Sequence, residues 1–567
     1  MTPYKEKILA SSLDMLDHEW GPFMGSLSRD DAAFVRERLF RLPRPIQHSL
    51  LEQYNRLNSG FIANTYLRTV TDELFQILPP LAIKHFDDDE QSLRDLASDC
   101  ASLCEEIGMP VKPLTSRSSL TVSIKKLVIP VNGIKSVNGL ESGQEQLVFT
   151  LCSKVVNEFG LTPPQIEKPV TLTGAIRRMQ DRNWWMKKLR KRLNQAREQA
   201  MRVIGRVNAR YGKYCSDLTV KNRQSQKQSQ LMRLDNIRLT NEFGDSFSLR
   251  EIYEMGISNP VNRRNELMAR MRGLENQAKT LGLSGLFITI TCPSKFHSHY
   301  AKSGDRNPKW NGSTPYDAQQ YLNSVWQRIR AELKRRDIKQ CGMRVVEPQH
   351  DGTPHWHLLM FYAPEHRDEL MDVYSHYALL EDGDEPGAAS NRCDFKDIDY
   401  TKGSATGYIA KYISKNIDGG HLDTDIDGND AKLAAMRVEA WASCWGIRQF
   451  QQIGGAVITP WRELRRLKLV DDNSPELVAI HSAADNGNFA DYLALMGGLF
   501  VKRTEQAVRP LYKEEVNPET GQIKQSWYDG LITRKLKGII HKGQEILTRL
   551  HTWQMEYVSQ PAMLAAN

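Results

Sequence analysis

Hydrophobic residues recur at helical spacing through most of the first 170 residues of the chain. Leucines lie three or four residues apart in Leu9–Leu16, and the segments Asp30–Arg41 and Glu90–Ile107 have the period of amphipathic helices. The run Leu120–Ile124 is typical of a short strand. We therefore expect a mostly helical N-terminal domain over residues 1–170, whose role no motif indicates.

Between residues 250 and 425 the pattern changes to short runs of β-branched and aromatic residues, separated by helical segments. Gly, Pro, Asn and Asp mark the turns. The expected strands are Leu286–Thr291, Cys341–Glu347 and His355–Tyr362, and the expected helices are Tyr316–Arg336, Pro364–Leu380 and Ala405–Lys415. Strands and helices are thus mixed within one region.

Helical spacing returns after residue 425. Asn429–Trp445 is an expected helix, and Pro460–Arg466 is a cluster of basic and aromatic residues. A turn rich in Gly, Asn and Pro is expected at Asn517–Gly521. Residues 426–567 are therefore expected to form a mostly helical C-terminal region.

Length and charge divide the chain further. A chain of 567 residues is too long for one compact core, which favours roughly two to four domains. The net charge is +8, but Ile176–Arg238 alone carries 18 Lys and Arg against 4 Asp and Glu. The rest of the chain is therefore net acidic, and residues 171–249 form a distinct basic helical region.

The basic region interleaves its cations with aromatic residues, among them Trp184, Trp185 and Tyr211. Cations that neutralise phosphates and rings that stack on bases are together typical of nucleic-acid binding. The candidate DNA-contact residues are Arg177, Arg178, Lys187, Lys188, Arg190, Lys191 and Arg192. The alternative is a solvated helical face whose tryptophans pack on a neighbouring domain.

Composition also narrows the cellular setting. The eight cysteines are scattered and form no Cys-x-x-Cys pair, so neither a disulfide framework nor a cysteine-based zinc module is supported. The N-terminus has no apolar core of signal-peptide type, and no run of about eighteen apolar residues occurs. We expect a soluble intracellular protein with free thiols and no membrane partner.

Two histidines separated by one residue lie in the third expected strand. Residues two apart in a strand point to the same face, so His355 and His357 project together and Trp356 points the other way. Glu347 ends the preceding strand, and an antiparallel pairing would bring its carboxylate to that face, although His350 in the connecting loop competes as a ligand. Two imidazoles and a carboxylate suit Mg²⁺ or Mn²⁺. An isolated pair of this kind also occurs by chance in half-exposed strands.

A pair of tyrosines follows about fifty residues later. Tyr408 and Tyr412 are four residues apart and so share a helix face. Each is followed three residues later by a lysine, Lys411 or Lys415. A phenol is a poor nucleophile at its ordinary pKa of about 10, so something must favour the phenolate, and a metal bound to the phosphate together with a nearby ammonium can do this. Ordinary helix packing explains one tyrosine pair, but not a duplicated Tyr-x-x-Lys unit after a histidine strand.

These motifs resemble the HUH endonuclease superfamily of rolling-circle initiators and, more narrowly, the bacteriophage replication gene A proteins. The strand and histidine element of that family often reads Glu-Pro-x-x-Asp-Gly-Thr-Pro-His-x-His, and Glu347–His357 matches this pattern. Phe287–Ser294 matches the first family motif, a strand of threonines that ends near a proline. The similarity spans residues 285 to 417, and Arg263–Met268 and the basic region resemble the family more loosely.

The resemblance implies an α+β fold whose central HUH-type, ferredoxin-like antiparallel sheet with flanking helices forms an endonuclease domain over residues 250–425. It also implies that one of the two tyrosines attacks a phosphate of single-stranded or supercoiled origin DNA. The products are a 5′-phosphotyrosine link and a free 3′-OH, which the host polymerase extends. The second tyrosine then cuts the regenerated origin, and the displaced strand is rejoined into a circle. Mg²⁺ or Mn²⁺ and the cytoplasm of the bacterial host cell belong to the same expectation.

The sequence leaves two other classes of function open. One is a non-catalytic nucleic-acid-binding module, which leaves the tyrosine and lysine units unexplained. The other is a metal-dependent hydrolytic nuclease in which water attacks the phosphate. No Gly-x-x-x-x-Gly-Lys-[Ser/Thr] motif occurs, so the leading interpretation needs a partner for unwinding, which in such phages is a host helicase.

Overall fold

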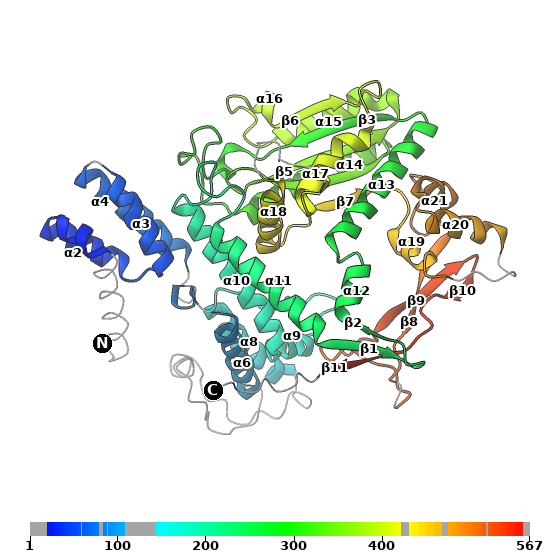
Figure 1. The fold of residues 1–567 in the computed structure, drawn as a ribbon, viewed down its shortest axis with the longest axis horizontal. Coiled ribbons are helices and arrows are strands. Elements are labelled where there is room, and N and C mark those ends of the chain that lie inside the picture. The colour runs from blue at the N-terminus through cyan, green and yellow to red at the C-terminus, as the bar shows by residue number, and fades with distance from the viewer. Residues whose placement is uncertain are drawn as a thin grey trace. The chain divides into compact units, whose positions relative to one another are not determined.

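A computed structural model describes most of the chain (Figure 1). The described residues are 20–57, 59–78, 83–87, 89–107, 142–420, 430–467, 474–517 and 520–558. Contacts divide the chain into two compact units, of which the first is Met1–Arg206 with Glu515–Thr533 and the second is Val207–Glu514 with Arg534–Asn567. The four-part division expected from composition and motifs stays a prediction.

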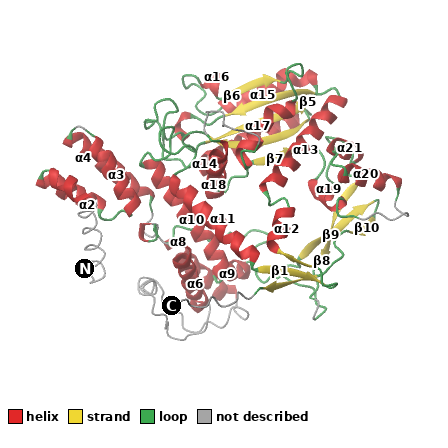
Figure 2. Ribbon diagram, viewed as in Figure 1, coloured by secondary structure: helices red, strands yellow, loops and turns green. Residues whose placement is uncertain are grey.

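Helices make up most of the first unit (Figure 2). They include α2 (Arg29–Leu39), α3 (Arg44–Arg56), α4 (Gly60–Ile77), α6 (Glu90–Ile107), α8 (Ser142–Glu158), α9 (Leu172–Met179) and α10 (Arg182–Val203). Side-chain oxygens of Ser28, Thr171 and Asp181 accept backbone N–H groups at the starts of α2, α9 and α10, which satisfies donors that a helix leaves unpaired. The expected helical character of this region is confirmed for the residues described here. The expected helix at Leu9–Leu16 and strand at Leu120–Ile124 lie outside the described residues.

A hairpin from far along the sequence completes the first unit. Within residues 515–533, isolated bridges join Val516 to Ile523 and Gln525 to Ile532. Asp529 accepts two hydrogen bonds from the Arg178 guanidinium, one of 2.9 Å and one of 2.5 Å, and a third from the backbone N–H of Thr171. The hairpin therefore packs against the start of α9, although more than three hundred residues separate the two segments in the chain.

The second unit is built around a five-stranded sheet in which every neighbouring pair is antiparallel. Its order is β6-β3-β5-β4-β7, with β3 at Ser284–Ile290, β4 at Gln340–Pro348, β5 at Pro354–Tyr362, β6 at Cys393–Asp397 and β7 at Phe450–Ile453. The two longest strands, β4 and β5, are buried along nearly their whole length. Antiparallel sheets beside many helices confirm the expected α+β class.

Helices cover both faces of this sheet. The buried core on one face includes side chains of α14 (Pro315–Arg335), α15 (Arg367–Leu379) and α18 (Ala431–Trp445). The core on the other face includes α13 (Pro260–Thr280), α17 (Ala405–Ile417), α19 (Ile458–Leu464), α20 (Pro475–Asp485) and α21 (Phe489–Leu495). Alternating strand residues feed the two cores, since Trp356 and Leu358 belong to the first and Leu359 to the second. The strands and helices expected between residues 284 and 417 are all present.

The C-terminal region differs from the sequence expectation. Among the described residues the last helix is α21, and the elements after it are β8 (Val508–Glu514), β9 (Arg534–His541), β10 (Gln544–Leu547) and β11 (Trp553–Tyr557). β8, β9 and β10 form one small sheet, and β11 pairs with β1 (Ile237–Asn241), which also pairs with β2 (Ser246–Ser248). The expectation of a mostly helical region is therefore wrong beyond residue 507. Polar and charged residues make up much of β8 and β9, and all five residues of β11 are exposed, so these strands carry little of the apolar alternation that identifies a strand.

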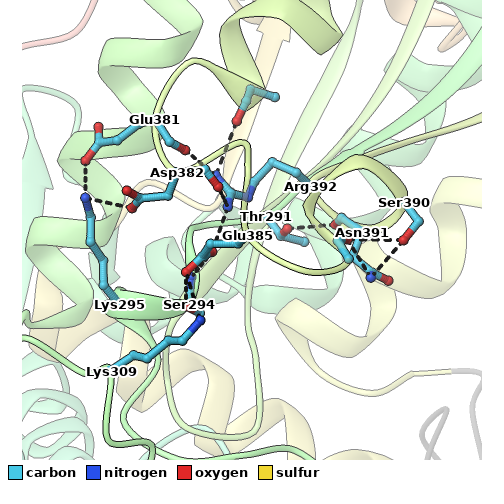
Figure 3. A network of polar contacts seen from close by, with 12 residues as sticks. Thr291, Ser294, Lys295, Lys309, Glu381, Asp382, Glu385, Ser390, Asn391 and Arg392 are labelled. Carbon is cyan, nitrogen blue, oxygen red and sulfur yellow. Dashed lines mark hydrogen bonds and ion pairs between the residues drawn. The ribbon is translucent and has the colours of Figure 1, made fainter.

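A polar network fixes the loop that leaves β3 (Figure 3). The buried Arg392 donates to the backbone carbonyl of Glu381 at 2.9 Å and to the carboxylate of Glu385 at 3.1 Å. Glu385 also accepts a hydrogen bond from the backbone N–H of Ser294, and the Thr291 hydroxyl donates to the carbonyl of Asn391 at 2.8 Å. The network ties the end of β3 to the segment α16 (Ala388–Asn391) that precedes β6.

Candidate metal and tyrosine site

The two histidines and Glu347 lie on one face of the central sheet. β4 pairs with β5 in antiparallel register, with Glu347 directly opposite His355. The Nε2 atoms of His355 and His357 are 2.9 Å apart, and His357 Nε2 is 3.8 Å from a carboxylate oxygen of Glu347. One ligand atom from each of these three residues lies within 4.8 Å of the others. The strand pairing that the sequence interpretation needed is therefore present.

The loop between β4 and β5 holds this register. Gly352 has φ +82°, and an added Cβ there would meet the carbonyl oxygen of Tyr214 at 2.9 Å. The fully buried Asp351 accepts backbone N–H groups of Thr353 at 3.0 Å and Ser298 at 2.7 Å. His350 lies in this loop with Nε2 2.9 Å from the carbonyl oxygen of His299, and it is not part of the three-residue group.

Burial keeps both imidazoles neutral. Desolvation, with smaller contributions from Lys415 and His297, lowers the pKa of His355 to about 3. Burial and the neighbouring His355 likewise lower the pKa of His357 well below its ordinary value. The Thr289 hydroxyl lies 3.1 Å from His357 Nδ1, which leaves Nε2 of that ring facing the group. Neutral imidazoles keep lone pairs available, as metal ligands must.

The carboxylate of Glu347 is buried, and side chains of α17 hold it in place. Asn416 donates a short hydrogen bond to Oε1, and Lys415 Nζ lies 3.5 Å from Oε2. Gln449 in turn donates to the Asn416 side-chain oxygen at 3.0 Å. Burial raises the pKa of Glu347, and the Lys415 ammonium opposes this increase. Two neutral imidazoles beside a carboxylate are a donor set that fits a divalent cation, and the buried Nδ1 of His355 has no partner among the described residues.

Helix α17 carries both tyrosines, Tyr408 at the end of its first turn and Tyr412 one turn later. The helix is fixed at its start, where Glu275 accepts backbone N–H groups of Ala405 at 3.0 Å and Thr406 at 2.8 Å. The ring centroid of Tyr412 lies 4.1 Å from that of His357. Burial and the Glu347 charge raise the pKa of the Tyr412 phenol. Tyr408 lies one turn earlier on α17 and is half-buried.

The two lysines are not equivalent. Lys415 is 7% exposed and lies between Glu347 and the Tyr214 ring, whose centroid is 5.1 Å from Nζ. Lys411 is exposed on α17. The structure thus brings Lys415, and not Lys411, to the metal-ligand group, although both follow a tyrosine by three residues.

Comparison with known proteins identifies the family. Residues 125–420 match the family of bacteriophage replication gene A proteins (GPA). The chain belongs to this family. It is 42% identical over 418 residues to the replication gene A protein of Escherichia phage 186, and the matched residues cover 70% of this chain and 59% of that protein. It is 35% identical over 499 residues to the probable replication protein P12 of Pseudoalteromonas phage PM2, and the matched residues cover 84% of this chain and 76% of that protein.

Other gene A relatives are longer than the matched part. A probable replication endonuclease from a prophage-like region of Salmonella paratyphi A is 36% identical over 363 residues, which is 61% of this chain and 45% of that protein. The chain therefore spans about half to three fifths of several of the relatives it matches. No solved structure matches the chain. Among the described helices, none is both long and apolar enough to cross a membrane.

The basic region of this gene A family member is partly engaged within the first unit. Arg178 pairs with Asp529, Arg190 pairs with Glu90, and Arg177 donates to the carbonyl of Trp527 at 2.7 Å. Arg192 is half-buried, while Lys187, Lys188 and Lys191 are exposed, with Lys188 Nζ 5.6 Å from the Trp184 ring centroid. Trp185 is fully buried, as the packing alternative expects. DNA contact by this region stays a prediction, and the exposed lysines are its best candidates.

Several residues around the site carry no chemical motif of their own. Asn416 and Gln449 hold Glu347, Thr289 orients His357, and Tyr214 covers Lys415. Thr289 could have been found, since it lies in the threonine strand of the first family motif. Asn416 directly follows the second tyrosine and lysine unit, but its contact with Glu347 depends on how α17 packs. Gln449 and Tyr214 give no signal in the sequence.

Proposed function

We propose that the protein is a metal-dependent endonuclease that initiates phage rolling-circle replication by nicking one strand of origin DNA with a tyrosine nucleophile and later rejoining the displaced strand. The observation that carries this proposal is the short distance between Tyr412 and His357, whose ring centroids are 4.1 Å apart. His357 belongs to the candidate metal-ligand group with Glu347 and His355. Membership of the gene A family supports it. The central sheet serves as the HUH-type, ferredoxin-like core of an endonuclease domain over residues 250–425.

The chain's own residues account for the chemistry at the phosphate. Mg²⁺ or Mn²⁺, held by His355, His357 and Glu347, would supply positive charge to the phosphate oxygens. Lys415 and Asn416 keep the Glu347 carboxylate in place. The tyrosine oxygen loses its proton and bonds to phosphorus, while the bond from phosphorus to the 3′ oxygen breaks and that oxygen gains a proton. The products are a 5′-phosphotyrosine link and a free 3′-OH.

Rejoining uses the second tyrosine of α17. After one round of synthesis, Tyr408 or Tyr412, whichever is still unmodified, cuts the regenerated origin. The released 3′-OH attacks the first phosphotyrosine, which restores that phenol and closes the circle. Lys411 is exposed on α17 and is available to a DNA phosphate beside the tyrosines. The host polymerase extends the 3′ end, a host helicase unwinds the duplex, and the reaction takes place in the cytoplasm of the bacterial host.

The direct test incubates the protein with supercoiled and single-stranded origin DNA and Mg²⁺ or Mn²⁺, followed by denaturing gel analysis. We expect a protein–DNA adduct that survives denaturation and that EDTA prevents from forming. The double variant Tyr408→Phe/Tyr412→Phe should give no adduct. Tyr400→Phe is the matched control, because Tyr400 lies before α17 with its ring against Lys279.

The other outcomes separate the alternatives. If the double variant still cleaves the DNA and leaves a 5′ end free of protein, the protein is a hydrolytic nuclease and the tyrosine mechanism is wrong. Binding of origin DNA without any cleavage, with or without metal, would leave a non-catalytic binding module.

A further inference from the structure

A polar cavity lies on the face of the central sheet opposite the candidate metal ligands. Its volume is about 350 Å³, and it is enclosed by α14, β4 and the segment around β7. Its lining includes Arg330 on α14, Arg344 on β4 and Arg448 just before β7, and no acidic residue. The Arg344 guanidinium lies 4.0 Å from the ring centroid of Trp356, whose side chain points away from the histidines.

Arg344 is the unusual member of this cavity. It is 4% exposed, and its Nε has no hydrogen-bond partner among the described residues. Burial, with a smaller contribution from the neighbouring Arg448 charge, lowers the pKa of Arg344 to about 10. A buried cation without a carboxylate partner is costly to a folded protein. An anionic ligand in the cavity would offset that cost.

A second basic cavity lies on the other side of β7. It has a volume of about 410 Å³ and is lined by Arg263, Arg270 and Arg462, and it shares Arg448 with the first cavity. Its one acidic residue, Glu266, is already paired with Arg462 at 2.7 Å and lies 3.7 Å from Arg270. Alternation along the edge strand explains the arrangement, because Gln451 lines the first cavity while Phe450 and Gln452 line the second. Arginines therefore follow the sheet edge from one face to the other.

This edge is connected to the candidate metal site. Gln449, next to Arg448, donates to Asn416, which donates to Glu347. Arg344 and Glu347 are three residues apart on β4, about 10 Å along the strand. The two side chains point to opposite faces of the sheet, so a DNA strand with one phosphate at the metal ligands passes around the edge strand β7 to reach the first cavity.

We propose that the two cavities bind successive phosphates of the DNA strand beside the scissile phosphate, with Arg448 contacting the strand where it passes the edge of the sheet. This inference rests on the proposed function. Two adjacent basic cavities suit a polyanion, which can fill both, better than they suit a single small anion. Amide side chains of Gln320, Asn323 and Gln327 also line the first cavity, and such groups hydrogen-bond to the edges of unpaired bases.

The first experiment measures binding of a labelled single strand of mixed sequence by fluorescence anisotropy in EDTA, over a range of salt concentrations. For Arg448→Gln we expect weaker binding, and a slope of log K against log salt that is smaller by about 0.7 for each lost phosphate contact. Arg328→Gln is the matched control, because Arg328 is exposed on α14 and lines neither cavity. Equal affinities and slopes for the wild type and Arg448→Gln would overturn the proposal.

The second experiment separates ligand binding from a structural role of Arg344. If Arg344 serves a ligand, Arg344→Met should weaken DNA binding while its melting temperature stays equal to or above that of the wild type. A lower melting temperature with unchanged DNA binding would show a structural role and overturn the proposal. Inorganic phosphate is the probe for a small anion. If phosphate raises the melting temperature of the wild type but not that of Arg344→Met, and the variant binds DNA as the wild type does, the cavity holds a small anion. That result also overturns the proposal.

Adduct formation distinguishes this inference from the proposed function. If wild type and Arg448→Gln form the tyrosine adduct equally well at every DNA concentration, the cavities are not part of the DNA path, while the nicking activity stands. If the wild type forms no adduct but Arg448→Gln still loses DNA affinity, the cavities bind DNA and the proposed nicking activity fails.

Discussion

Within α17, Tyr408 and Tyr412 have different surroundings. Tyr412 packs on His357, and its ring centroid is also 5.4 Å from that of Phe287. The backbone carbonyl of Tyr412 accepts a hydrogen bond of 2.6 Å from Asn416, the same side chain that holds Glu347. Tyr408 lies a full turn away from these contacts. The two phenols therefore start at different positions relative to the candidate metal ligands.

The first prediction follows from this difference. Tyr412→Phe should slow the first nick of a single-stranded origin oligonucleotide more than Tyr408→Phe does, by about 10²-fold, because a phenol displaced from the phosphate attacks poorly. Single-turnover adduct formation measures both rates. Equal rates for the two variants would show that α17 shifts before attack and that either tyrosine can begin.

The second prediction concerns Asn416, which touches Glu347 without being a candidate ligand itself. Asn416→Ala should weaken Mn²⁺ binding by about 10- to 100-fold, because the carboxylate loses a partner that orients it. Isothermal titration of the whole protein with Mn²⁺ measures the dissociation constant. Lys411→Ala, an exposed change on the same helix, serves as the control and should bind Mn²⁺ as the wild type does. An unchanged constant in Asn416→Ala would contradict the orienting role.

At the scale of secondary-structure elements, the position of α17 depends on a carboxylate from α13. Glu275 is 2% exposed and accepts hydrogen bonds from the first N–H groups of α17, the Thr406 hydroxyl and Lys279. Burial by itself would raise the pKa of Glu275, but these hydrogen bonds outweigh it and the pKa lies below its ordinary value of 4.5. A lowered pKa means that the charged form stabilises the fold above pH 4.5, and that this contribution is lost as the pH falls through the lowered value.

The third prediction follows from that sign. Glu275→Gln should lower the free energy of unfolding by about 1–3 kcal/mol at neutral pH, because the helix start loses a charged acceptor. The difference from the wild type should shrink in acid, where the wild-type carboxyl is also neutral. Urea unfolding at both pH values measures it. Glu254→Gln, which removes an exposed pair with Arg250, should change stability by less than about 1 kcal/mol.

Local patterns predicted the elements of the site well. The alternation of β5 placed His355 and His357 on one face, and the short loop after Glu347 made antiparallel pairing the natural outcome. The spacing of Tyr408 and Tyr412 predicted a shared helix face. In contrast, the contact from Asn416 to Glu347 joins residues 69 apart in the sequence, and no local pattern specifies which residue of α17 meets β4. The same limit applies to Gln449 and Tyr214.

At the scale of the whole molecule, the first unit depends on residues near the other end of the chain. The Asp529 side chain is 5% exposed in its pair with Arg178, and the Arg178 guanidinium also stacks on Tyr528 at 4.7 Å from the ring centroid. The Arg178 contact lowers the pKa of Asp529. The sequence expectation assigned Arg178 to DNA, because a cation in a basic helix gives no sign of a carboxylate 351 residues away.

The fourth prediction tests this dependence. Asp529→Ala should destabilise the first unit by about 2–4 kcal/mol, because it leaves the Arg178 guanidinium without its carboxylate partner. Scanning calorimetry of the full chain should show one thermal transition shifted down and the other unchanged. Glu505→Ala, which removes an exposed pair with Lys502 in the second unit, is the control and should shift neither. A shift of both transitions after Asp529→Ala would mean that the two units unfold together.

The hairpin over residues 515–533 also sets an order of events during protein synthesis. The ribosome makes Met1–Arg206 before the roughly 300 residues of the second unit, and the hairpin only after these. At about 5–20 residues per second, the first unit waits on the order of 15–60 s for its last part. Most of the unit that holds the candidate site emerges within that interval. The start of α9 is thus translated long before the residues that complete its packing.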